Sequence, residues 1–153
     1  MTPTDFDHEI DDLTFFTRVP DPTPRRSCMI AIADRNTRRL LAIHLEKLGY
    51  DVWTSPSGLD AYRTCVQDHA DPEVLVCDEH LPDLPPLVLF NKLRTQFPAL
   101  QCCVVANVTR RESAEDYEHM FDPIVLDVVG WRSGMLFVNA TMPANLGEKS
   151  GLR

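Results

Sequence analysis

The sequence predicts an α/β fold in which a parallel β-sheet is covered by helices on both faces. Short apolar runs that are typical of buried strands begin at Cys28 and recur along the chain. Segments with apolar residues at helical spacing separate these runs. Strands that alternate with helices form a parallel sheet, because each helical connection crosses one face of the sheet before the next strand begins.

The first expected strand and helix occupy residues 28–49. Residues 28–33 form a continuous apolar run and are expected to be a buried strand. Asn36 or Thr37 is expected to cap the following helix, whose leucines recur at helical spacing. Gly49 suits the end of that helix, because glycine adopts the left-handed conformation found there.

The middle of the chain repeats the alternation. Residues 50–54 alternate as a second strand, and residues 59–66 have the spacing of a second helix. The apolar run 74–77 is the purest strand pattern in the chain, and it ends at Asp78. The loop after Asp78 holds three prolines and leads into a third helix, with apolar positions within residues 89–97.

The C-terminal part is less regular. Residues 102–105 are expected to be a fourth strand, residues 112–120 a polar helix and residues 124–126 a fifth strand. Residues 131–142 contain a short apolar run next to Gly134, and periodicity leaves a short helix and an added strand equally open. The last helix of the fold therefore stays undefined.

Both ends of the chain have the composition of flexible tails. Residues 1–26 are rich in Asp, Thr and Pro, and residues 143–153 lack an apolar pattern, so one domain is expected over residues 27–142. Residues 11–19 form an apolar island with two adjacent phenylalanines. This island is expected either to pack on the domain or to be a linear motif for a partner.

Composition excludes several classes of function. The formal net charge of −8 disfavours binding to nucleic acid or to an anionic membrane. The five cysteines form no C-x-x-C pair, which favours buried thiols in a reducing compartment over a zinc or redox site. No signal peptide or membrane-spanning run is found, so a cytoplasmic protein is expected.

Two carboxylates follow predicted strands. Asp34 comes after the first strand and Asp78 ends the third, and neighbouring parallel strands would bring both to one crevice. Paired carboxylates there are suited to Mg²⁺, and an aspartate can attack phosphorus to form an acyl phosphate. The alternatives are a helix-entry role for Asp34 and a turn role for Asp78.

Three segments carry a resemblance to a known family. Residues 30–36, residues 57–61 and the run 74–83, which continues through Asp78 into Leu-Pro-Asp, are similar to motifs of the response-regulator receiver domain, the CheY-like family. The match covers about residues 28–126. It implies a flavodoxin-like (βα)5 fold with a five-stranded parallel sheet in the order 2-1-3-4-5.

The resemblance also implies functional roles. Asp78 would accept a phosphoryl group from a histidine kinase or a phosphotransfer protein, and Mg²⁺ would be held by Asp34, Asp78 and the backbone carbonyl of His80. The chain would be a stand-alone response regulator and not an enzyme, with output through contacts with a downstream protein partner. A homodimer is left open.

The chain also departs from the family pattern. Ala33 stands in place of a second acid, Ala106 in place of a Thr or Ser, and Asp127 in place of a Lys near the end of the fifth strand. Asp34, Asp78 and Asp127 would give the pocket a charge of −3, which implies a weakened Mg²⁺ site. The alternative is therefore a pseudo-receiver, which binds partners without phosphorylation; a flavodoxin-like enzyme or flavin carrier lacks support, because no phosphate-binding loop follows the first strand.

Overall fold

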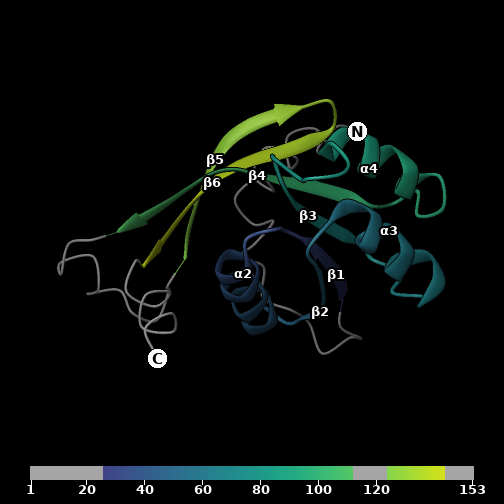
Figure 1. Cartoon of the computed structure of the whole chain (residues 1–153), viewed down its shortest axis with the longest axis horizontal. Coiled ribbons are helices and arrows are strands. Elements are labelled where there is room, and N and C mark those ends of the chain that lie inside the picture. Colours follow the sequence, from purple (N-terminus) through teal and green to yellow (C-terminus); the bar gives the residue numbers. More distant parts are fainter. Residues whose placement is uncertain (1–25, 112–123, 144–153) are drawn as a thin grey trace, which may run out of the picture.

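The computed structural model describes residues 26–111 and 124–143 (Figure 1). Within these ranges the chain forms one mixed sheet and three helices. The strands are β1 (Arg26–Ala31), β2 (Tyr50–Ser55), β3 (Val74–Asp78), β4 (Gln101–Arg111), β5 (Val125–Arg132) and β6 (Met135–Pro143). The helices are α2 (Arg35–Lys47), α3 (Gly58–Gln67) and α4 (Pro86–Arg94).

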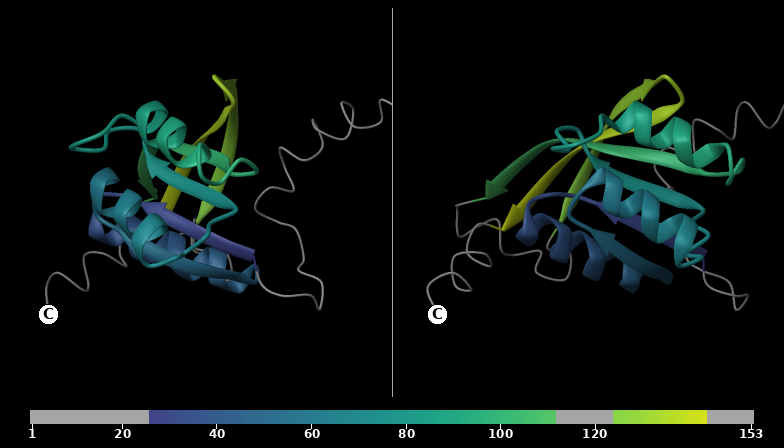
Figure 2. Two further views of the ribbon diagram at one scale, coloured as in Figure 1. Left: turned by 90° about the vertical axis from the view of Figure 1, so that its right-hand side faces the viewer. Right: turned by 45° about the vertical axis from the view of Figure 1, so that its right-hand side comes forward.

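Helices cover both faces of the sheet, as the sequence predicts (Figure 2). Leucines of α2 pack on one face and leucines of α4 on the other, where α3 also contributes. Neighbouring residues of a strand divide between the two faces: Cys103 belongs to the core under α2 and Cys102 to the core under α4. This division explains why the inner strands are apolar at almost every position.

The first four strands have the expected order. β1 pairs in parallel with β2 on one side and with β3 on the other, and β3 pairs in parallel with β4. The chain therefore moves outward in one direction from β1 to β2 and in the other direction from β3 to β4. The expected order 2-1-3-4 is confirmed, and with it the flavodoxin-like class.

The far edge of the sheet differs from the predicted single fifth strand. The parallel neighbour of β4 is β6, and β5 pairs antiparallel with β6 at the edge, so the order is β2-β1-β3-β4-β6-β5. The cause is a tight turn at Ser133 and Gly134, whose φ angles are 55° and 80°. Two positive φ angles in a two-residue turn are typical of a type I′ hairpin, which returns the chain onto itself. Of the two structures left open for residues 131–142, the strand is the one observed.

Several predictions concern residues outside the described ranges. These are the polar helix at residues 112–120, the apolar island at residues 11–19 and the two terminal tails. Of the helices in the described ranges, none combines the length and the apolar character needed to cross a bilayer.

All five cysteines are buried and reduced. Burial raises the pKa of the Cys65 thiol to about 12, because the thiolate would lose its hydration. The sulfur atoms of Cys77 and Cys102 lie 3.8 Å apart within the core under α4. All five thiols are buried and serve as small core side chains, as the sequence predicts.

Candidate functional site

A pocket of about 400 Å³ opens beyond the carboxyl ends of β1, β3 and β4. From β1 the chain continues to β2 on one side of the sheet, and from β3 it continues to β4 on the other side. The pocket lies at this switch point, which is the usual ligand site in doubly wound sheets. Apolar residues of the strand ends form part of its wall. The polar and charged residues that line it are Asp34, Thr37, Asp78, His80, Asn107 and Arg110.

Asp78 is the last residue of β3 and lines this pocket. The four residues before it are buried on both faces of the sheet, and Asp78 itself pairs in register with Val105 of β4. Its Oδ1 atom accepts a hydrogen bond of 3.0 Å from the backbone N–H of His80. The carboxylate thus closes a local turn and also lines the pocket. Its position at the end of the third strand is the one that the sequence predicts.

Asp34 lies in the same pocket and caps α2. Its Oδ2 atom accepts hydrogen bonds from the backbone N–H of Thr37 at 2.8 Å and from the Thr37 hydroxyl at 2.7 Å. The prediction of Asn36 or Thr37 as the cap is wrong: the helix begins at Arg35, and the buried Thr37 hydroxyl donates to the capping residue. A carboxylate at the strand exit reaches both donors at the helix start.

Hydrogen bonding and charge hold Asp34 in its ionised form. The bonds from Thr37 lower the pKa of Asp34 below its usual value, and the positive charges of Arg110 and Arg38 lower it further. Arg38 itself donates from Nη1 to the backbone carbonyls of Ile32 and Ala33, at 2.7 and 3.2 Å. A negative charge therefore persists at the end of β1 at neutral pH.

Arg110 is the pocket residue that sequence reasoning missed. Its Nη2 atom lies 3.9 Å from Oδ2 of Asp34. β4 contributes Val105, Ala106, Asn107, Val108 and Arg110 to the lining, and its register shifts between Val105 and Asn107. The sequence predicts that the fourth strand ends at residue 105, whereas β4 continues to Arg111, so Arg110 lies outside the predicted strand.

The expected place of Asp127 in the pocket is wrong. Asp127 lies on the edge strand β5, in register with Asn139 of β6, and is not among the pocket-lining residues. The error follows from the wrong choice of the fifth strand. The strand that adjoins β4 is β6, where Val138 pairs with Val105. The residue after Val138 is Asn139, and its Oδ1 atom accepts a hydrogen bond of 3.3 Å from the Asn107 side chain.

The pocket charge changes accordingly. Among the described residues the charged lining side chains are Asp34, Asp78 and Arg110, whose formal charges sum to −1 and not to the −3 expected from the sequence. No lysine of the described residues lines the pocket, but the guanidinium of Arg110 on β4 supplies a positive charge to the cavity.

The residues present fit Mg²⁺ poorly. Among the described residues no group of three or more His, Cys, Asp or Glu side chains is arranged to hold a metal. His80 lines the pocket, but the contact it makes with Asp78 uses its backbone N–H, and its side chain is 83% exposed beside Glu79. Asp34 already shares its Oδ2 between two hydrogen bonds and a nearby cation.

The loop after Asp78 is attached to the start of α3. Asp83 accepts hydrogen bonds of 2.9 Å from the backbone N–H groups of Gly58 and Leu59. A Cβ atom on Gly58 would lie 3.0 Å from the Cβ of Leu84, so the loop packs tightly against this glycine at the start of α3. The Leu-Pro-Asp motif thus has a structural role that the sequence did not reveal, because the partner helix starts 25 residues earlier.

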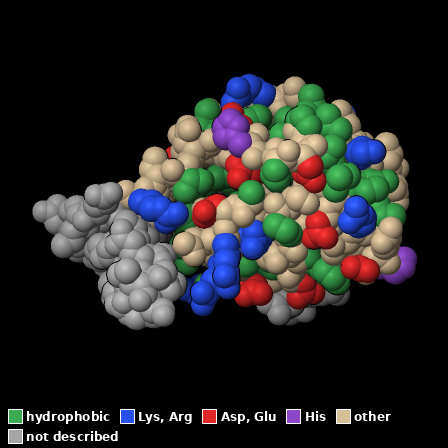
Figure 3. Space-filling view, viewed as in Figure 1, with side chains coloured by type: hydrophobic (Ala, Val, Ile, Leu, Met, Phe, Trp, Pro, Cys, Tyr) green, Lys and Arg blue, Asp and Glu red, His purple; other side chains and the backbone are tan. Residues whose placement is uncertain are grey.

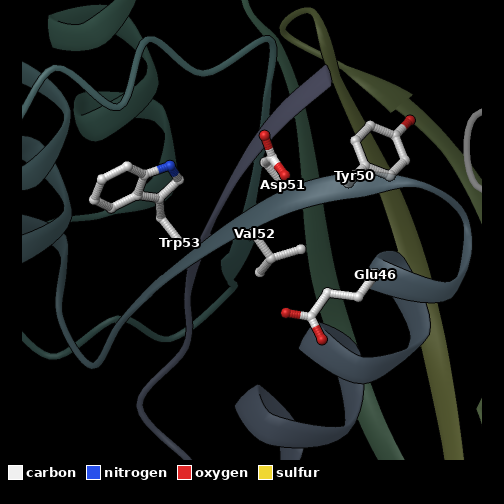
Figure 4. A pocket seen from close by; sticks show the side chains of 5 residues that line it. All are labelled: Glu46, Tyr50, Asp51, Val52 and Trp53. Carbon is white, nitrogen blue, oxygen red and sulfur yellow. The ribbon is translucent and has the colours of Figure 1, made fainter. Parts of the chain in front are cut away.

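A second cavity, of about 550 Å³, lies on β2 away from these strand ends (Figure 4). Glu46 reaches it from α2, and Tyr50, Asp51, Val52 and Trp53 line it from β2. Trp53 is 38% exposed there. The cavity begins at the N-terminal end of β2, whereas the C-terminal ends of the inner strands form the pocket around Asp78.

No family model and no curated protein sequence matches this chain. Solved structures are similar to it. A response regulator receiver domain protein from Clostridium thermocellum has a TM-score of 0.50 and 11% identity, over 84% of this chain and 99% of that one. The N-terminal domain of an uncharacterized protein from Wolinella succinogenes has a TM-score of 0.50 and 17% identity, over 82% and 91% of the two chains. The chain therefore has the flavodoxin-like fold found in receiver domains.

Proposed function

We propose that this chain is a receiver-type signalling domain of a two-component phosphorelay, in which Asp78 accepts a phosphoryl group. The observation that carries the proposal is the position of Asp78: it ends a central buried strand and faces a pocket that it shares with Asp34. The receiver-type fold supports the same assignment. The domain would comprise residues 27–142, with flanking tails, and would act through protein contacts and not as an enzyme.

The proposed chemistry is a single phosphoryl transfer. A carboxylate oxygen of Asp78 attacks the phosphorus of a phosphohistidine on a histidine kinase or a phosphotransfer protein. A P–O bond forms and the P–N bond breaks, and the histidine nitrogen keeps the electron pair. Positioning and charge neutralisation carry most of the catalysis of such a transfer, so the residues around Asp78 matter more than a general acid or base.

The attached loop offers a route for output. Phosphorylation of Asp78 would replace the carboxylate that accepts the His80 N–H, and it would add about one negative charge. His80 lies in the loop that reaches α3 through Asp83. A change at Asp78 would therefore be felt at the start of α3, where a downstream protein could detect it.

A specific observation also favours the pseudo-receiver alternative. Ala106 lines the pocket and carries no hydroxyl that could follow a phosphoryl group, and Asp34 is engaged by Thr37. Under this alternative the surface at the start of α3 binds a partner protein with no covalent change at Asp78. The two proposals differ in one measurable property, the ability of Asp78 to be phosphorylated.

The test is incubation of the full chain with acetyl phosphate, followed by intact-mass measurement. We expect one added phosphoryl group of about 80 Da in the wild type and none in Asp78→Asn. Asp71→Asn is the matched control, because it removes an exposed carboxylate outside the pocket at a position whose φ of 49° suits asparagine. An adduct that persists in Asp78→Asn, or none in the wild type, would exclude Asp78 as the acceptor and favour the pseudo-receiver.

A further inference from the structure

The pocket around Asp78 contains a positive charge of its own. We propose that the Arg110 guanidinium takes the place of a divalent cation here, so that the pocket receives a phosphate-class dianion without a metal. The inference rests on the proposed function for its ligand, the phosphoryl group destined for Asp78. It differs from the Mg²⁺ site that the sequence resemblance implies.

The Oδ2 atom of Asp34 is poorly available to a metal. It already accepts two hydrogen bonds from Thr37, and the Arg110 Nη2 atom lies 3.9 Å from the same oxygen. A divalent ion on that oxygen would have to approach against the charge of the guanidinium. Since Ala33 carries no carboxylate, the end of β1 offers no second acid to compensate.

Arg110 keeps donors for an incoming anion. The distance of 3.9 Å to Asp34 is longer than a hydrogen bond, so this contact is an ion pair that does not use the N–H groups. A guanidinium presents five N–H donors in a planar fork that matches the oxygens of a phosphate. Arg110 can therefore neutralise Asp34 at rest and bind a phosphoryl group when one arrives.

The backbone holds Arg110 over the pocket. β4 pairs with β3 only as far as Val105, but it continues to Arg111 along β6, and in Figure 1 this part of β4 and β6 projects beyond β1 and β3 together with the start of β5. A register shift between Val105 and Asn107 bends β4 at the point where it leaves β3. Bulges of this kind commonly redirect side chains beside active sites. Paired strand backbone positions a side chain more firmly than a free loop does.

The helix that begins beside the pocket is basic in its first two turns. Three arginines, Arg35, Arg38 and Arg39, lie in the first two turns of α2, whose first turn has no acidic residue. A helix dipole favours acids at that end, so local helix stability does not explain this composition. Basic side chains gather over α2 in Figure 3, although the whole chain has a net charge of −8. These arginines add positive charge to the helix that begins beside the pocket.

The first experiment measures Mg²⁺ binding by the shift of the thermal unfolding midpoint. We expect no saturable shift for the wild type in millimolar Mg²⁺. Arg110→Gln should gain a saturable shift, because the two carboxylates lose their counter-ion, and the additional change Asp78→Asn should abolish it. Arg63→Gln, which removes an exposed arginine outside the pocket, is the matched control and should behave as the wild type.

The second experiment measures the rate of phosphorylation by acetyl phosphate in EDTA and in Mg²⁺. We expect the wild-type rate to be the same within about twofold in both, since Arg110 supplies the charge. In EDTA, Arg110→Gln should lower the rate by at least about tenfold, and Arg110→Lys should restore part of it.

The outcomes separate this inference from the proposed function. Phosphorylation that needs Mg²⁺ and is unaffected by Arg110→Gln would overturn the inference and leave the proposed function intact. If the wild type is never phosphorylated, the proposed function fails, and the Mg²⁺ titration still decides the role of Arg110. A wild type that binds Mg²⁺ as well as Arg110→Gln does, or an Arg110→Gln that gains no binding, would overturn the inference.

Discussion

Asp34 combines a structural role with an electrostatic one. As the N-cap of α2 it accepts two hydrogen bonds from Thr37, and as a pocket residue it faces the charge of Arg110. A cap at this position also explains the burial of Thr37, since the threonine hydroxyl finds its acceptor in Asp34 and not in water. Any change at Asp34 is therefore expected to affect the start of α2 and the pocket together.

The charge of Asp34 makes its contribution to stability dependent on pH. Its pKa in the folded protein is lowered below the usual 3.8, so the stabilisation is complete above 3.8 and is lost as the pH falls through the lower, folded value. Asp34→Asn keeps an N-cap but loses the charge. We expect the variant to be less stable than the wild type at pH 7 and the difference to shrink below pH 3.8, measured by urea denaturation at several pH values. A difference that stays constant with pH would contradict the electrostatic role.

At the scale of an element, the loop that follows β3 is held by contacts with α3. Its Asp83 supplies a second cap beside Ser57, whose hydroxyl accepts from the backbone N–H of Asp60 at 3.2 Å. The hydrogen bonds from the backbone of Leu59 and Gly58 lower the pKa of Asp83. The loop and the helix therefore stabilise each other, although the chain between them includes the whole of β3.

Removing this cap should weaken both elements. Asp83→Ala leaves two backbone N–H groups at the start of α3 without their acceptor, and we expect the free energy of unfolding to fall by roughly 1 kcal/mol. Asp83→Asn, which keeps one carbonyl acceptor, should lose less. Leu59→Ala is the control for the helix start, because this side chain is 42% exposed. Urea denaturation of the three variants checks the order, and an Asp83→Ala as stable as the wild type would contradict the cap.

At the scale of the whole molecule, the two cores share one sheet. Residues of the same strand alternate between the core under α2 and the core under α4, so neither face can lose its packing while the strands stay intact. Leu41 belongs to the first core and Leu93 to the second, and both are fully buried. The structure therefore predicts one cooperative unit.

We expect Leu41→Ala and Leu93→Ala each to lower the free energy of unfolding by about 2–5 kcal/mol. Because the two sites lie on opposite faces, the effects should add within about 0.5 kcal/mol in the double variant. Tryptophan fluorescence and far-UV circular dichroism during urea denaturation should report coincident transitions. Separate transitions for the two signals would show that the faces unfold independently.

Much of the inner fold could be predicted because local patterns and tertiary packing agree there. The apolar run before Asp78 is a strand by its composition, and it is buried on both faces in the sheet. The placement of Asp34 and Asp78 in one pocket followed from parallel strand order alone. Near residue 133 the local pattern does not specify the structure, because a short apolar run fits either a helix or a strand until its pairing partner is known.

By itself, the sequence determined the α/β class, the first four strands and the shared location of the two aspartates. These features depend on hydrophobic periodicity and on the direction of parallel strands, which are properties of short stretches of chain. Only the tertiary structure decided that β6, not residues 124–126, adjoins β4, and that Arg110 and not Asp127 lines the pocket. Those features depend on which strand pairs with which, and pairing is set by contacts between residues far apart in the chain.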